Sequence, residues 1–435
     1  MPLATRCESL ERRSLFAVTP AAGLNPKFAF DTADIRKIAG EHTAVYDAVP
    51  ASGDRTYILA ERYNERKLAR KKPSEGYLAI ARVTADGKLD PTFGTNGVAL
   101  TERVTETRRS PDGEPPGILK VDVFGRIYVA DSYKVLRLRA NGTIDRAFGT
   151  RGSAAFGSYA QPAALTDIAP TTDDSVYVST TATTDGVQRF TVQEVGRSVR
   201  TVFTKTHDTG IRGLEEQGEN QTADGTYNGE RYFLKSAAQF AYNLDGVFLA
   251  RVETDYRSKP DTSRGYEATR QQVVVTGVGG FNENLYFDVA TAELRKGRFG
   301  STNLITVQKA GRFVYVQTGV EVVRLNVFTT DYKRFTQFGD STLDVSYRLL
   351  PDGYVYVVRP SLGRVDYRIA TIEKIGLDNT PDATFGDKGL LTIRLNKKTD
   401  AKNYLALGQL FLSSSNRPYL LIRGYYGGPT SLQRV

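Results

Sequence analysis

The sequence predicts an all-β protein: a single β-propeller of eight blades, each made of four antiparallel strands. Three observations lead to this prediction: a recurring turn motif, a recurring buried strand, and a repeat that is split between the two chain ends. The chain has 435 residues, 40% of them hydrophobic and 10% aromatic, with 40 glycines. Repeat folds exceed ordinary domain sizes because each unit packs only on its neighbours, so this length does not require several domains.

The first observation is a short turn that ends in Phe-Gly, with copies at residues 89–94, 144–149 and 382–386. An Asp-Gly or Asn-Gly pair precedes the first two copies and favours a tight hairpin. Glycine permits backbone angles that a side chain would block, and phenylalanine supplies bulk between adjacent blades. We expect Asp90 and Asp145 to accept backbone N–H groups in these turns. The residues to which we assign a structural role in the repeat are Phe28, Phe93, Phe148, Phe385, Gly94, Gly149 and Gly386.

The second observation is a short apolar strand that recurs eight times, rich in the β-branched and aromatic residues typical of a buried strand. An alternating strand follows each copy, and in the clearest repeats it ends in Arg-Val, so the count of eight is obtained twice. Seven blades is the alternative, if one degenerate unit forms no blade of its own. The residues aligned in the eight strands are Tyr57, Tyr128, Tyr177, Tyr232, Val274, Tyr315, Tyr356 and Tyr419.

The third observation concerns the chain ends. Residues 18–28 repeat the turn motif in register, and the chain stops at Arg434-Val435, which corresponds to Arg82-Val83 in the first complete unit. A unit begun at the C-terminus would then be completed by the N-terminus, which predicts a ring closed by pairing of the terminal strands. We therefore divide the chain into a leader, residues 1–17, and a propeller, residues 18–435.

Residues 79–97 resemble the bacterial delta-60 repeat, whose usual form ends Leu-Ala-Arg-x-x-x-Asp-Gly-Ser-Leu-Asp-x-x-Phe-Gly. Residues 141–152 and 378–389 match it less fully. The resemblance implies a propeller fold. It implies no activity, because proteins with this repeat are largely uncharacterised and share no catalytic residues.

Residues 7–17 resemble the short leader found at the start of many planctomycete surface and exported proteins. The resemblance implies export from a bacterial cytoplasm, to a secreted or cell-surface location. No run approaches the ~18 to 20 apolar residues that a membrane helix requires, so we expect no membrane span. The matching positions are Glu8, Leu10, Glu11, Arg13, Leu15 and Ala17.

Composition argues against several kinds of site. Cys7 is the single cysteine, and His42 and His207 are the two histidines, so we expect no disulfide, no metal site and no haem. His207-Asp208 is followed by several acidic residues and could act as a base, but an acidic loop is the simpler interpretation. The glycine-rich stretch 277–280 opens no helix, which argues against a dinucleotide site. The absence of tryptophan weakens a quinoprotein interpretation, and we predict no catalytic residue and no cofactor.

The candidate binding residues lie in an insertion of the first blade, residues 61–76, with six cations that could attract a polyanion. A solvated hairpin extension is the simpler interpretation of the same residues. Nucleic acid is disfavoured because Tyr63 is the one aromatic residue among these cations, whereas single-strand platforms use several. The six cations are Arg62, Arg66, Lys67, Arg70, Lys71 and Lys72.

Strand parity places the tight turns on one rim of the propeller and the variable connections on the other, where binding usually resides. The resulting hypothesis is a monomeric, non-catalytic, exported or cell-surface scaffold that binds an envelope protein or glycan, possibly polyanionic. The alternative is a carbohydrate-active enzyme, a lyase or hydrolase, with carboxylate and arginine side chains at the central channel.

Overall fold

A computed structural model of the protein describes residues 29–434 apart from the following ranges: 32–42, 63–74, 106–116, 132, 159–163, 185–186, 209–229, 244–245, 259–265, 279–287, 294–303, 311–312, 319–321, 330, 336–345, 350–353, 361–368, 377–379, 395–404, 413–417 and 425–430. The described residues form 28 strands and no helix, so the described part of the chain is all-β. They accordingly contain no helix that is long and apolar enough to cross a bilayer.

The strands form sheets of four antiparallel strands, which we number in chain order. Sheet 1 contains β2 (Thr43–Ala51), β3 (Arg55–Arg62), β4 (Glu75–Val83) and β5 (Val98–Thr105). Sheet 2 contains β6 (Ile118–Val121), β7 (Ile127–Ala130), β8 (Lys134–Leu138) and β9 (Ser153–Ala155). Sheet 3 contains β10 (Ala164–Pro170), β11 (Val176–Thr184), β12 (Val187–Val195) and β13 (Val199–Asp208).

The remaining sheets follow the same plan. Sheet 4 contains β14 (Glu230–Asn243), β15 (Gly246–Ser258), β16 (Tyr266–Val278) and β17 (Asp288–Glu293). Sheet 5 contains β18 (Leu304–Ala310), β19 (Phe313–Thr318), β20 (Val322–Asn326) and β21 (Tyr332–Phe335). Sheet 6 contains β22 (Ser346–Leu349), β23 (Tyr354–Pro360), β24 (Ile369–Gly376) and β25 (Leu390–Arg394). Sheet 7 contains β26 (Leu405–Leu412), β27 (Pro418–Gly424), β28 (Ser431–Arg434) and β1 (Ala29–Asp31).

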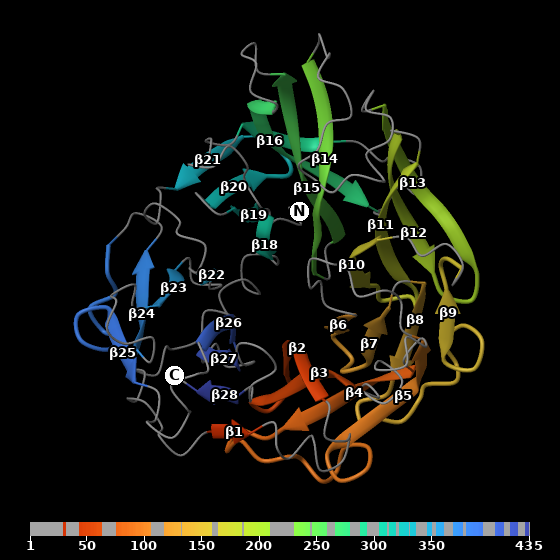
Figure 1. Ribbon diagram of the computed structural model, residues 1–435, viewed down its shortest axis with the longest axis vertical. Helices are drawn as coiled ribbons and strands as arrows, with labels where there is room; N and C mark the ends of the chain where they lie inside the picture. The colour runs from red at the N-terminus through yellow and green to blue at the C-terminus, as the bar shows by residue number, and fades with distance from the viewer. Residues whose placement is uncertain are drawn as a thin grey trace, which may run out of the picture.

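The sheets are arranged around a common centre in a propeller-like manner (Figure 1). The first strand of each sheet contacts the first strand of the next, in the order β2, β6, β10, β14, β18, β22 and β26. Strand β26 also contacts β2. The first strands therefore face the centre, and the fourth strands lie at the periphery.

Strand β1 joins the two ends of the chain in sheet 7. It pairs with β28 in an antiparallel register that places Ala29 opposite Gln433, Phe30 opposite Leu432 and Asp31 opposite Ser431. The repeat copy that the sequence indicates at residues 18–28, including Phe28, lies outside the described residues, and β1 begins directly after it. The sheet that contains the C-terminal strands thus takes its fourth strand from the start of the chain.

The sequence count of eight units differs from the seven sheets found in the described residues. The strand around Tyr232 belongs to β14 and the strand around Val274 belongs to β16, so the expected fourth and fifth units share sheet 4. Strand β15 pairs with both of them. In the other six sheets the aligned Tyr lies in the second strand. The difference arises because a first, a second and a third strand can all be short apolar runs, which periodicity alone does not distinguish.

Alternation within each strand explains why both faces of a sheet are buried. In β7, Ile127 and Val129 join the core between sheets 1 and 2, whereas Tyr128 and Ala130 join the core between sheets 2 and 3. All four side chains are buried. A strand that is covered on both faces is apolar at consecutive positions, which is the pattern by which the sequence identified it.

Antiparallel pairing also fixes two different rims. The turns between first and second strands, and between third and fourth strands, lie at one end of each sheet, which we call the tight-turn rim. The connections between second and third strands, and the crossovers between sheets, lie at the opposite end, which we call the crossover rim. Strands β3 and β13 therefore end at the crossover rim.

Candidate functional site

The predicted basic insertion begins at the end of β3. Arg62 is its one described member, and its backbone pairs with Thr43 in β2 and with Tyr77 in β4. The insertion therefore leaves the sheet at the crossover rim, and its site role stays a prediction. The other five candidates, which lie outside the described residues, are Arg66, Lys67, Arg70, Lys71 and Lys72.

Of the two histidine candidates, the structure describes His207. His207 and Asp208 are the last residues of β13, where their backbones pair with Gln188 and Val187, so they belong to a strand and not to the acidic loop that the sequence suggested. His42 and the acidic residues 215–224 lie outside the described residues. Within the described ranges, no group of three or more His, Cys, Asp or Glu side chains could hold a metal ion.

The structure does bring together a charged pair that sequence reasoning missed. In each Phe-Gly turn, a cation in the third strand lies against the turn aspartate: Arg82 Nε is 2.9 Å from Asp90 Oδ2, and Arg137 Nε is 2.8 Å from Asp145 Oδ2. In the third copy Lys374 Nζ lies 2.6 Å from Asp382 Oδ2. The signal was present in the sequence, because the cation precedes the aspartate by eight residues in all three copies.

The second carboxylate oxygen of each aspartate organises the turn itself. Asp90 Oδ1 accepts the backbone N–H of Thr92 at 3.0 Å, and Asp382 Oδ1 accepts that of Thr384 at 3.0 Å. Asp145 Oδ1 accepts the backbone N–H of Ala147 at 3.3 Å. This is the role that the sequence indicated for the turn aspartates, and it leaves the other oxygen free to pair with the cation.

The Phe-Gly phenylalanine connects the charged pair to the core. Phe148 packs edge-on against Tyr128 at 5.8 Å between ring centroids, and the Arg137 guanidinium lies 4.9 Å from the Phe148 centroid. Phe93 repeats both contacts, at 5.5 Å from Tyr57 and 4.9 Å from Arg82. Phe385 packs 5.2 Å from Tyr356. All three phenylalanines are buried, so the aligned tyrosines and the Phe-Gly turns form one packed unit.

The glycine after each phenylalanine is required by the backbone. Gly94, Gly149 and Gly386 have φ values of 52°, 51° and 55°, in the left-handed region. A Cβ at Gly149 would overlap the carbonyl oxygen of Ser153. A side chain at this position would therefore be strained both by its own backbone and by its neighbour.

We therefore expect Gly149→Ala to lower the free energy of unfolding by about 2 kcal/mol, because alanine is disfavoured at positive φ and would also collide with the chain. Urea unfolding followed by circular dichroism measures this. Gly157→Ala is the matched control, because a Cβ there meets nothing closer than 3.8 Å and φ is not positive. Equal losses in the two variants would show that the left-handed conformation is not the cause.

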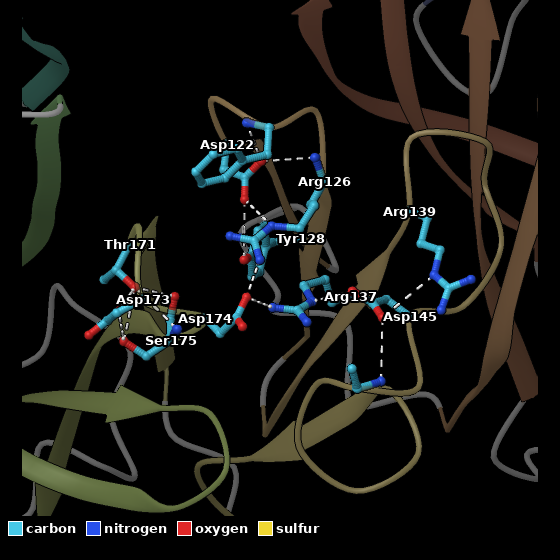
Figure 2. A network of polar contacts seen from close by, with 12 residues as sticks. Asp122, Arg126, Tyr128, Arg137, Arg139, Asp145, Thr171, Asp173, Asp174 and Ser175 are labelled. Carbon is cyan, nitrogen blue, oxygen red and sulfur yellow. Dashed lines mark hydrogen bonds and ion pairs between the residues drawn. The ribbon is translucent and has the colours of Figure 1, made fainter.

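Polar contacts from the tight-turn rim join neighbouring sheets (Figure 2). Asp174, in the turn between β10 and β11 of sheet 3, pairs with Arg126 and with Arg137 of sheet 2, the latter at 3.0 Å. Burial opposes the charge of Asp174, but the hydrogen bond and charge of Arg126, followed by those of Arg137, lower its pKa below the ordinary value. Sheet 1 is tied to sheet 2 in a similar way, because Arg82 donates to the carbonyl oxygen of Ala140 at 2.6 Å.

The first strands, which face the centre, include a buried carboxylate, Asp167 in β10. Lys120 Nζ of β6 lies 3.0 Å from Asp167 Oδ1, and the backbone N–H of Phe240 in β14 donates to Asp167 Oδ2 at 2.8 Å. The backbone N–H of Ile168 donates to Asp167 Oδ1 at 2.9 Å. Asp167 thus ties three consecutive first strands together, and its oxygens are already occupied by these partners. It does not offer a free acid or base at the centre.

Comparisons with known proteins found similar solved structures but no matching family. No family model matches it, and no curated protein matches it. Several solved structures match it along most of its length at low identity. The Pan2 WD40 domain of Neurospora crassa has 9% identity and a TM-score of 0.44, with 94% of each chain covered. The AfRom2 CNH domain has 9% identity and a TM-score of 0.40, with 93% of this chain and 96% of that chain covered.

An ulvan lyase of polysaccharide lyase family PL25 is similar to the chain at 8% identity and a TM-score of 0.45, covering 89% of this chain and 90% of that chain. Its structure was determined bound to a saccharide of GlcA and Rha3S units. Similarity at this level carries no argument about activity. The functional argument therefore rests on the described residues.

Proposed function

We propose that the protein is a closed, seven-bladed β-propeller of the delta-60 repeat type that acts as a non-catalytic binding scaffold. Its ligand would be an envelope protein or a glycan, bound through the crossover rim. The leader-like N-terminus supports an exported or cell-surface location. The contacts between successive first strands, including β26 with β2, and the pairing of β1 with β28 support the closed ring.

The observation that carries the binding proposal is the placement of the long connections. The insertion after β3 and the crossovers after β5 and β13 leave their sheets at the crossover rim. The Phe-Gly connections of the tight-turn rim have a similar length, but all three repeat one turn that is held by an ion pair. Varied connections on one side of a rigid scaffold are the usual place for recognition.

Four described aspartates are already held by structural contacts, which favours a scaffold over an enzyme. Asp90, Asp145, Asp167 and Asp382 each contact a cation and a backbone N–H. A general acid or base must reach the substrate, which these carboxylates could do only by giving up their structural contacts. The carbohydrate-active enzyme therefore remains the second hypothesis.

A glycan array probed with the full chain and with the chain starting at Ala17 tests the binding proposal. A variant with the six cations of the insertion changed to serine is expected to lose most of its binding to acidic glycans, because the polyanion attraction is removed. Undiminished binding by this variant would exclude the insertion as the site, and turnover of a bound glycan would favour the enzyme instead.

Two further measurements test the remaining parts of the proposal. N-terminal sequencing of the exported protein is expected to show that the leader, residues 1–17, has been removed, and an intact Met1 would count against processing. Sedimentation equilibrium is expected to give the mass of a monomer, 48.0 kDa for the full chain.

A further inference from the structure

The three Phe-Gly turns provide an internal comparison, because residues 82–97, 137–152 and 374–389 align without a gap. The positions with a structural role are the same in all three: a cation, an aspartate eight residues later, and the Phe-Gly pair. The other positions differ in charge, and the copy in sheet 2 is strongly basic. The charged residues are Arg82, Asp86, Lys88 and Asp90 (net zero), Arg137, Arg139, Asp145, Arg146 and Arg151 (net +3), and Lys374, Asp378, Asp382, Asp387 and Lys388 (net −1).

The excess charge of the sheet 2 copy is on the surface. Arg137 is buried against Asp145, whereas Arg139, Arg146 and Arg151 are exposed. The Arg139 side chain is 62% exposed and its Nε lies 3.6 Å from Asp145 Oδ1. Arg146 and Arg151 have no ion-pair partner among the described residues. We call these three exposed residues, Arg139, Arg146 and Arg151, the basic turn.

The basic turn is compact. Arg146 follows Asp145 directly, and Arg151 precedes Gly152, at which a Cβ would lie 3.4 Å from the Asp145 carbonyl oxygen. In Figure 2, Arg139 reaches toward the same aspartate from the side opposite to Arg137. All three side chains of the basic turn therefore start from one turn around Asp145, on the tight-turn rim.

Local stability does not explain these arginines. The equivalent residues in sheet 1 are Thr84, Pro91 and Asn96, and the turn forms there with the same hydrogen bonds. Arg151 has a φ of 56°, in the left-handed region, where asparagine is better tolerated than arginine; Asn96 occupies the same conformation with a φ of 52°. Lys388 occupies the same conformation in the third copy with a φ of 52°, so this conformation by itself does not explain the arginine. The turn nevertheless forms without arginine at any of the three positions, which points to a role for these arginines outside folding.

We propose that the basic turn is a second binding surface, and that its ligand is an anionic polysaccharide with carboxylate or sulfate groups. Arginine presents a planar fork of N–H donors that matches such groups in a bidentate manner. The surface lies on the rim opposite the one used in the proposed function, so it goes beyond that proposal and can fail independently of it.

A polysaccharide fits the turn better than a nucleic acid or a protein. The only aromatic residue within residues 137–152 is Phe148, which is buried. Proteins that bind single-stranded nucleic acid stack bases on several exposed rings, and protein interfaces rely on aromatic anchors. One exposed ring, Phe124, lies in the neighbouring turn between β6 and β7. The next residue, Gly125, packs close to Ala140, which follows Arg139 of the basic turn. A single ring can pack against the C–H face of a sugar.

The test replaces each arginine with a residue that the chain itself uses in an equivalent turn: Arg139→Thr, Arg146→Ala and Arg151→Asn together. Heparin is the probe, and its affinity for the full chain is measured by calorimetry at several salt concentrations. We expect the dissociation constant to rise at least about tenfold at low salt. We also expect the salt dependence to become shallower, because fewer counterions are released on binding.

A reciprocal variant separates the loss of a binding surface from a folding defect, because it is expected to gain binding. Thr84→Arg, Pro91→Arg and Asn96→Arg together place a basic turn on sheet 1 and are expected to strengthen heparin binding. Unchanged heparin affinity in the variant without the three arginines overturns the proposal of a second binding surface. If heparin binding is then abolished by the serine variant of the insertion, the insertion is the binding site and the proposed function is unaffected. The assignment to a polysaccharide is overturned if single-stranded DNA of matched charge binds more tightly than heparin and if that binding is lost when Phe124 is replaced.

Discussion

Phe148→Ala is expected to lower the free energy of unfolding by about 3 to 5 kcal/mol. Phe148 is 2% exposed and belongs to the core between sheets 2 and 3. Its ring contacts Tyr128 and lies under the Arg137 guanidinium, and both partners are held in strands, so they cannot collapse into the space that the ring leaves. The cost therefore includes an unfilled cavity as well as the lost apolar burial.

Urea unfolding monitored by tyrosine fluorescence measures this loss. Phe328→Ala is the matched control, because Phe328 is 77% exposed in the turn between β20 and β21 and is expected to change stability by no more than about 0.5 kcal/mol. A similar loss in both variants would contradict the view that the Phe-Gly phenylalanine holds adjacent sheets together.

Asp90→Asn is expected to lower the free energy of unfolding by about 3 kcal/mol, because it removes one partner of a buried ion pair. The side chains of Arg82 and Asp90 are only 7% and 8% exposed. Asparagine can still accept the backbone N–H of Thr92, but it leaves the Arg82 charge uncompensated. The hydrogen bonds from Arg82 to Ala140 and to Thr92 remain and limit the loss.

The same pair predicts a pH dependence. Burial alone would raise the pKa of Asp90, but hydrogen bonds from the Thr92 hydroxyl and backbone and the charge of Arg82 lower it to about 2, from the ordinary value of 3.8. Since the pKa is lower in the folded state, the stabilising effect of the charged carboxylate is fully present above pH 3.8. It is lost as the pH falls through about 2.

Thermal unfolding of the wild type and of Asp90→Asn across this pH range tests both statements. The difference in stability between them is expected to be constant above pH 4 and to shrink toward pH 2. Asp86→Asn is the control, because Asp86 lies on the surface of the same turn and its loss should change stability little. A difference that does not vary with pH would show that the ion pair is not the source of the stabilisation.

Much of the fold could be predicted from the sequence, because its determinants are local. The Phe-Gly turns and the buried tyrosine strands are short patterns that impose the same backbone wherever they occur. The unit around Tyr232 and Val274 could not be divided correctly, because the pattern of a buried strand does not record its position in the sheet. The pairing of Arg82 with Asp90 was missed for a related reason: it joins two strand segments that only the turn geometry brings together.

The candidate surfaces show the same division. The sequence located six cations in the insertion after β3, which lie within eleven consecutive residues and are therefore visible as a cluster. It did not identify the basic turn, because Arg139, Arg146 and Arg151 are separated along the chain and meet only after the turn has formed around Asp145.

The sequence by itself determined the all-β class, the four-stranded repeat, the turn residues and the use of the chain start beside the chain end, because each depends on a short stretch of chain or on repetition. Only the tertiary structure decided how many sheets the described repeats form, which carboxylates are occupied by cations, and which arginines remain exposed. Those properties depend on contacts that exist only once the turns have formed and the sheets have packed, because burial and the dielectric surroundings are then set by the neighbouring sheet.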